Sequence, residues 1–125
     1  MFTTFDILDN IYDVLHDANY ENIFKISKPV NTILDSYIVI NTLDITPDIL
    51  QQCHVNVNYH VRDIDKTKRI ANYETLQLGA NALITTLDDY NDGDIDISIS
   101  FQRIMMEDDL PEHYVNIRLI VRHVQ

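Results

Sequence analysis

The stretch Cys53-His54-Val55-Asn56-Val57-Asn58-Tyr59-His60-Val61-Arg62 has the most regular pattern in this sequence. Apolar side chains occupy its odd positions and hydrophilic side chains its even positions. Successive side chains of a β-strand point to opposite faces, so this period of two predicts a strand over residues 52–63. One face of that strand is expected to be buried and the other polar.

Further strands are expected on both sides of this stretch. Apolar and polar residues alternate over residues 95–102 and from 115 to the end, which predicts a hairpin whose connection, residues 106–112, contains Pro111. The unbroken apolar run at the start of residues 37–43 is typical of a strand covered on both faces, and we expect it to be central. A short strand is predicted over residues 22–27.

Two segments have the spacing of amphipathic helices. Residues 5–18 place apolar side chains three and four positions apart, with aspartates largely on the other side. A second helix of about twenty residues is predicted to begin near Asp65-Lys66-Thr67 and to continue to Asp88. Each helix therefore has one apolar stripe to bury.

These elements predict an α+β fold, built as a mostly antiparallel sheet of about five strands with two helices packed on one face, in a single domain over residues 1–125. The other face of the sheet is expected to remain polar and uncovered by the chain. We assign to it Asn56, Asn58, Ser98, Ser100, Asn116 and Arg118. A polar face with free sheet edges is suited to a protein partner.

The amino-acid composition disfavours several classes of function. Hydrophobic residues make up 46% of the 125 residues, as in a folded protein, and 20 acidic against 9 basic residues give a net charge of -11. Such acidity disfavours binding to free nucleic acid, which requires a basic surface. Cys53 is the only cysteine, so no internal disulfide is possible. The start, Met1 to Asp6, has no basic leader, and no run approaches the roughly 18 apolar residues of a membrane span, so neither export nor insertion is expected.

No catalytic motif is recognisable. Two glycines leave no room for a phosphate-binding loop, and neither Gly-x-Ser-x-Gly nor His-Glu-x-x-His occurs. Cys53 lies within an apolar strand face and is interpreted as a core thiol. We therefore expect no enzyme activity and no cofactor, although a pocket with converging titratable groups would reopen the question.

No metal site is expected either. His54 and His60 share a strand face but lie roughly 20 Å apart along an extended chain, so they are interpreted as ordinary surface histidines, like His16, His113 and His123. The acidic stretch 88–96 fails as a calcium loop, because Tyr90 occupies a ligand position and Ile99 replaces the closing glutamate. A solvated turn is the simpler interpretation.

Basic residues are few but clustered. Arg62, Lys66, Lys68 and Arg69 lie close in sequence, and Lys28 or Arg103 could join them. This cluster is either a solvated helix start or a contact with an acidic neighbour. In an acidic subunit, a local basic surface favours head-to-tail association into rings.

The order of these elements resembles the tail-terminator or tail-completion proteins of long-tailed bacteriophages. The resemblance covers nearly the whole chain: a first helix, a loop before Ser36-Tyr37-Ile38-Val39-Ile40, a polar-alternating strand ending in Val61-Arg62-Asp63, a long helix and a terminal hairpin. It rests on element order and length rather than on a diagnostic motif.

The resemblance implies a virion protein, assembled in the host cytoplasm, that forms a ring at the head-proximal end of the tail tube. Such a ring, commonly of six copies, terminates the tube and helps to join it to the head or neck. Its partners would be copies of itself, the tail tube protein and neck or connector proteins, while DNA passes through without specific binding. It implies no catalytic residue, cofactor or membrane.

Two sets of residues are candidates for these roles. The acidic lumen candidates, which would repel passing DNA, are Asp88, Asp89, Asp92, Asp94 and Asp96. The assembly-interface candidates, from the loops over residues 28–36 and 106–112 and from the basic cluster, are Lys28, Asn31, Asp35, Arg62, Lys66, Lys68, Arg69, Met106, Glu107 and Asp108. The alternatives are another head-tail connector, such as a head-completion or stopper protein, and a small acidic adaptor or inhibitor that binds a host protein.

Overall fold

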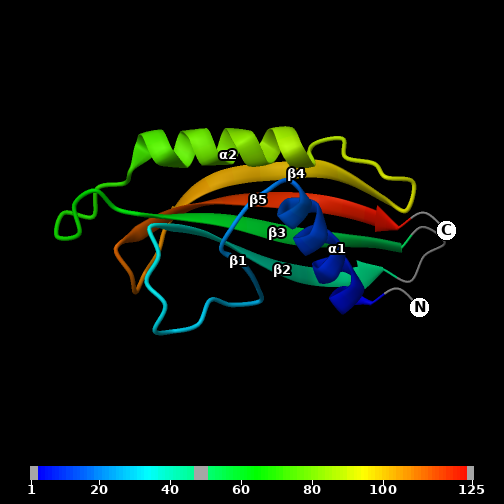
Figure 1. Ribbon diagram of the computed structural model, residues 1–125, viewed down its shortest axis with the longest axis horizontal. Helices are drawn as coiled ribbons and strands as arrows, with labels where there is room; N and C mark the ends of the chain where they lie inside the picture. The colour runs from blue at the N-terminus through cyan, green and yellow to red at the C-terminus, as the bar shows by residue number, and fades with distance from the viewer. Residues whose placement is uncertain (1–2, 47–50, 124–125) are drawn as a thin grey trace.

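A computed structural model describes residues 3–46 and 51–123. Its elements follow the predicted order of helix, three strands, helix and two strands (Figure 1). Their bounds are α1 (Thr4–Asp17), β1 (Ile23–Lys25), β2 (Ser36–Thr46), β3 (Gln51–Arg62), α2 (Tyr73–Leu87), β4 (Ile95–Met106) and β5 (Glu112–His123).

The five strands form one sheet in the order β1-β2-β3-β5-β4. β1 pairs with β2 in parallel, and the other three pairings are antiparallel. The predicted α+β class and its mostly antiparallel sheet are therefore confirmed. β3, rather than the expected residues 37–43, is the central strand, and β2 lies one position from the edge.

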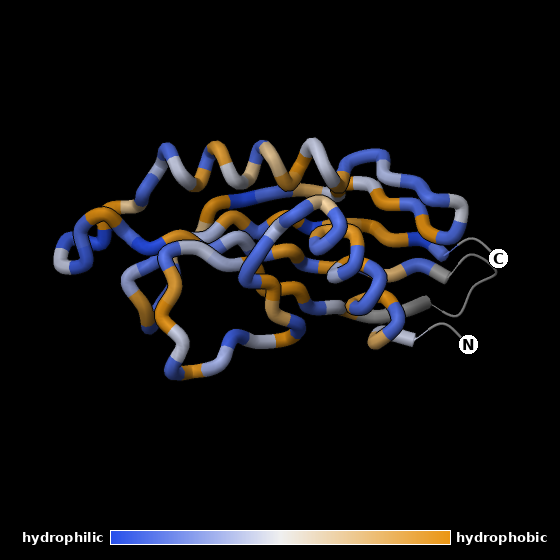
Figure 2. Tube along the Cα trace, in the orientation of Figure 1, coloured by the Kyte–Doolittle hydropathy of each residue, from blue (hydrophilic) through white to orange (hydrophobic). Residues whose placement is uncertain are grey.

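Both helices pack on the same face of the sheet. The core lies between them and the apolar side chains that alternate along the strands. Figure 2 shows the hydrophobic and hydrophilic residues alternating along the strands and helix turns. Large, fully buried side chains come from both helices and from β2, β3, β4 and β5; they include Ile7, Ile11, Leu15, Ile40, Val55, Val57, Leu83, Leu87, Ile95, Ile97, Ile117 and Leu119. Cys53 is fully buried among them, as expected of a core thiol.

The first helix begins with a capping box. The Thr3 hydroxyl accepts a hydrogen bond from the Asp6 backbone N–H at 3.2 Å, and the Asp6 carboxylate accepts one from the Thr3 N–H at 2.8 Å. These contacts satisfy two backbone donors that have no partner within the helix. They fix the start of α1 one residue before the predicted position.

The second helix begins later than predicted. Asp65 accepts hydrogen bonds from the Thr67 and Lys68 backbone N–H groups, which closes a turn instead of starting a helix. The helix starts at Tyr73, where the Asn72 side chain accepts from the Thr75 N–H. The sequence pattern predicted too long a helix, because it counted Ile70 as part of the apolar stripe. Ile70 belongs instead to the turn, where it forms a β-bridge with Asp65.

The terminal hairpin is longer than predicted and contains a bulge. β4 continues to Met106 and β5 begins at Glu112, so only residues 107–111 connect them. The register with β5 shifts between Ile99 and Phe101, which leaves Ser100 without a partner and places Phe101 opposite Arg118. The predicted alternation over residues 95–102 is therefore wrong at the bulge, where Phe101 lies beside Arg118 on the polar face.

The face opposite the helices carries a hydrogen-bonded polar row across three strands. The Asn116 amide donates to Asn56 at 3.2 Å and to Asn58 at 2.6 Å, and Asn56 donates to Asn41 at 3.0 Å. Arg118 also donates to Asn56. Neither helix covers this face, as predicted, but Asn116 is buried by its neighbours rather than left open.

Among the described residues, neither helix is long and apolar enough to cross a membrane.

Candidate functional site

One end of the sheet collects all ten assembly-interface candidates. Because β2 and β5 both run antiparallel to β3, the start of β2, the end of β3 and the β4–β5 turn meet at this end, on the left in Figure 1. Lys28, Asn31 and Asp35 lie before β2, and the other candidates lie at or after the ends of β3 and β4. The grouping expected from sequence therefore occurs in space.

A depression of about 200 Å³ lies between the loop that precedes β2 and the β4–β5 turn. Lys28, Arg62 and Lys66 line it together with apolar residues, so Lys28 does join the basic cluster. The apolar part of its wall comprises Val30, Ile33, Leu34, Leu110 and Pro111. This end thus offers a hollow with a mixed basic and apolar lining.

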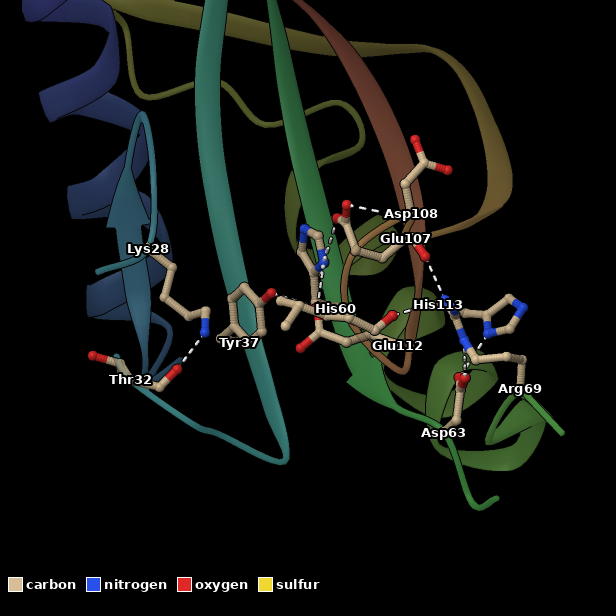
Figure 3. Close-up of polar contacts among 11 residues, drawn as sticks. Lys28, Thr32, Tyr37, His60, Asp63, Arg69, Glu107, Asp108, Glu112 and His113 are labelled. Atoms are coloured by element: carbon tan, nitrogen blue, oxygen red, sulfur yellow. Dashed lines mark hydrogen bonds and ion pairs between the residues drawn. The ribbon is translucent and has the colours of Figure 1, made fainter. Parts of the chain in front are cut away.

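Some of the basic candidates also have structural contacts. Arg62 lies 3.6 Å from the exposed Asp35 carboxylate. Arg69 forms an ion pair with Asp63 at 3.3 Å and donates hydrogen bonds to the backbone carbonyls of Glu107 and Leu110. The Asp63 side chain is fully buried and lies 2.6 Å from the His113 ring. Because Arg69 contacts both Asp63 and two carbonyls of the β4–β5 turn, it ties this turn to the end of β3 (Figure 3).

His60 is buried, which corrects its interpretation as a surface histidine. Only 6% of the residue is exposed, because its ring lies between the rings of Tyr37 and Tyr114, with centroids at 4.5 and 4.6 Å. His60 Nδ1 has no hydrogen-bond partner and lies 3.3 Å from Glu112 Oε1 and 4.0 Å from Glu107 Oε2. Figure 3 shows the imidazole and both carboxylates turned toward one another.

Glu112 is the most constrained member of this cluster. It is only 4% exposed and accepts a hydrogen bond of 2.5 Å from the Tyr37 hydroxyl. Burial alone would raise the pKa of Glu112, but the nearby His60 ring and the Tyr37 hydroxyl outweigh it and bring that pKa below its usual value. Burial, together with the hydrogen bond to Glu112, raises the pKa of Tyr37.

Glu107 completes the cluster from the other side of the hairpin. Its backbone N–H donates to the Glu112 carbonyl, so the two glutamates lie opposite each other across the turn. Like charges placed directly across a strand pair destabilise it unless a positive group lies between them. In the part of the chain that the structure describes, His60, Glu107 and Glu112 are the one group of three side chains placed to hold a metal ion.

The sequence did not predict this cluster, although it contained part of the signal. Alternation placed His60 on the polar face of its strand, and Glu107 was an interface candidate. The missing information was the register of the hairpin, which brings Glu112 opposite Glu107 only because β4 extends to Met106. Tyr37 was expected to be buried simply as part of an apolar strand.

The acidic lumen candidates lie at the opposite end of the molecule, in and after the α2–β4 turn. Asp92 organises that turn, because its carboxylate accepts hydrogen bonds from the Asp94 and Ile95 N–H groups at 2.9 Å, which lower its pKa. Asp96 pairs in register with Arg122 on the polar face. Asp88, Asp89 and Asp94 are exposed.

Comparison with protein-family models and with curated proteins gives no match to this chain.

Proposed function

We propose that this chain is a ring-forming structural protein at the head-proximal end of a phage tail tube. In this role it terminates the tube and helps to join it to the head or neck. It acts by assembly, with copies of itself, the tail tube protein and neck proteins as partners, and it resides in the virion.

The observation that carries this proposal is that the sheet has two unlike edges, each with exposed apolar side chains. β4 is a 12-residue edge strand on which Phe101, Ile104 and Met106 are exposed, with Ile104 at 60%. The opposite edge is the three-residue β1, followed by a loop that exposes Ile26, Val30 and Ile33, with Val30 at 94%. Unpaired strand edges and exposed apolar groups are templates for association.

Two different surfaces on opposite edges suit a head-to-tail contact. Such a contact repeats from subunit to subunit and closes into a ring when the rotation permits. A contact between identical patches would instead stop at a dimer. Ring formation would therefore bury the exposed apolar side chains of both edges.

The charge distribution supports the same role. Asp88, Asp89 and Asp94 are exposed at one end of the sheet, and Lys28, Arg62 and Lys66 share the depression at the other end. In a ring with the acidic ends turned inward, the negative wall repels DNA and lets it pass. The mixed basic and apolar end then lies on the outer side of the ring, where an adjoining virion protein can contact it.

The test replaces one exposed residue on each edge. Ile104→Asp blocks the β4 edge and Val30→Asp blocks the β1 edge, since each places a charge in an apolar contact. We expect both variants to fold normally but to fail to rescue particles that lack the protein, and imaging of rescued wild-type particles with the labelled chain should show a ring at the neck. Leu78→Asp is the matched control, because Leu78 is 67% exposed on α2 and lies outside both edges.

Mixing the two variants distinguishes a head-to-tail ring from other assemblies. Each mixed pair has one intact contact, so cross-linking should trap pairs but no closed ring. Absence of the chain from particles, or a stable complex with a host protein instead, would favour the adaptor alternative. A label at another layer of the neck would identify a different head-tail connector.

A further inference from the structure

We propose that His60, Glu107 and Glu112 form a binding site for one divalent transition-metal ion, such as Zn²⁺ or Mn²⁺. The ligands would be His60 Nδ1, Glu107 Oε2 and Glu112 Oε1, with water completing the coordination. This inference does not depend on the proposed function, because it concerns the purified chain alone.

The positions of the ligand atoms suit such an ion. The three atoms all lie within 4.8 Å of one another, and His60 Nδ1 lies 3.3 and 4.0 Å from the two carboxylate oxygens. Metal–ligand bonds of about 2.0–2.2 Å place neighbouring ligand atoms roughly 3–3.5 Å apart. Only the Glu107 side chain needs to move inward, and it is the most exposed of the three, with 31% of its side chain exposed.

The donor types select the class of ion. One imidazole nitrogen and two carboxylate oxygens suit first-row divalent metals, whereas Ca²⁺ and Mg²⁺ prefer oxygen ligands throughout. The cluster contains no thiolate, so it does not favour soft metals. A neutral imidazole with two carboxylates carries two negative charges, which a divalent ion balances.

Without an ion, the cluster has two energetically unfavourable features. The buried His60 Nδ1 has no hydrogen bond, and an unsatisfied buried polar atom destabilises the folded state. Glu107 and Glu112 face each other across the hairpin as like charges. One cation between the three groups resolves both. Lys28 is the nearby opposing charge, and it lies over the outer side of the Tyr37 ring, at 4.9 Å from its centroid.

Neighbouring groups already orient the proposed ligands. The Tyr37 hydroxyl donates to Glu112, and the Asp108 backbone N–H donates to Glu107 Oε1 at 3.2 Å, which leaves Oε2 directed at the cluster. The Tyr37 and Tyr114 rings hold the His60 ring between them. Metal ligands are commonly held by such outer contacts, whose loss typically lowers metal affinity about 10–100-fold.

The ion would join two separate parts of the chain. His60 belongs to the central strand, while Glu107 and Glu112 are the residues on either side of the β4–β5 turn. An ion bound to all three ties that turn to β3. Since Leu110 and Pro111 line the depression at this end, metal occupancy would fix the shape of the depression.

The test measures Zn²⁺ binding to metal-free protein at neutral pH by calorimetry, together with the thermal unfolding midpoint. We expect one site per chain and a rise in the midpoint on adding Zn²⁺. Glu107→Gln preserves shape but removes a carboxylate, so it should weaken binding at least about tenfold. Asp109→Asn is the matched control, because it removes an exposed negative charge from the same turn without removing a ligand or a contact to one, and it should bind like wild type.

His60→Gln should abolish Zn²⁺ binding. If His60→Gln fails to fold, the comparison of wild type with Glu107→Gln still decides the question. Equal affinity in wild type and Glu107→Gln would overturn the proposal, since it would show an adventitious ion only, held by other histidines. Absence of saturable binding to wild type would also overturn it. Because ring assembly is not measured, failure of this test leaves the proposed function untouched.

Discussion

At the scale of single residues, Gly79 shows how a position in a helix can be determined by a side chain on another element. Gly79 lies in the middle of α2, where glycine is normally about 0.5–1 kcal/mol less favourable than alanine. A Cβ at this position would overlap the ring of Tyr59 on β3. The absence of a side chain therefore allows the tyrosine ring to lie directly against the helix backbone.

We predict that Gly79→Ala destabilises the protein in spite of the better helix propensity of alanine. Overpacking costs about 1–3 kcal/mol, which exceeds the propensity gain, so the free energy of unfolding should fall by about 1–2 kcal/mol. Urea unfolding measures this change. In a Tyr59→Val background the same substitution should become neutral or stabilising, and an equal loss in both backgrounds would contradict the explanation.

At the scale of elements, the β4–β5 turn depends on Arg69 from the segment before α2. Its guanidinium group contacts the buried Asp63 carboxylate and the carbonyls of Glu107 and Leu110. The planar guanidinium can make these contacts together, whereas a lysine ammonium on a flexible chain lacks the required fork of donors. One side chain outside the hairpin therefore holds two backbone carbonyls of the turn in place.

We predict that Arg69→Lys loosens this turn while leaving the rest of the sheet intact. The amides of residues 108–110 should exchange hydrogen faster, and the free energy of unfolding should fall by about 1–3 kcal/mol, because Asp63 remains buried with a poorer partner. Hydrogen exchange followed by mass spectrometry locates the effect. Lys68→Arg is the control on the adjacent exposed position, and unchanged exchange in Arg69→Lys would show that the Arg69 contacts are unimportant.

The elements that the sequence predicted well are those in which a local pattern coincides with burial. Alternation around Val55 and Val57 predicted β3 within one residue at each end, and the spacing of Ile7, Ile11 and Leu15 predicted α1 equally well. The start of α2 and the bulge near Ser100 were missed. Neither can be predicted from the spacing of apolar residues. The start of α2 depends on the hydrogen bonds of the Asp65 turn, and the bulge depends on the pairing register of β4.

At the scale of the whole molecule, the fold class followed from counting apolar faces, but the candidate site did not. One face of the sheet and two helix stripes needed burial, which is sufficient to predict two helices on one side. The His60 cluster required knowledge of which residues of β3, β4 and β5 lie next to one another. Pairing register is set by the packed core and the turn together, so it is a property of the folded chain rather than of any single segment.

This cluster also predicts how stability depends on pH. The pKa of Glu112 lies below its usual value of 4.5, so the unfolded chain takes up a proton at higher pH than the folded chain. The ionised carboxylate therefore stabilises the fold above about pH 4.5, and this contribution is lost as the pH falls through the lower folded pKa. We expect the difference in unfolding free energy between wild type and Glu112→Gln, measured by urea titration with EDTA present, to be largest at pH 7. It should shrink steadily between pH 5 and pH 3, since protonated glutamic acid and glutamine are both uncharged. A difference that stays constant from pH 7 to pH 3 would show that the charge of Glu112 contributes nothing to holding β3 and the β4–β5 turn together.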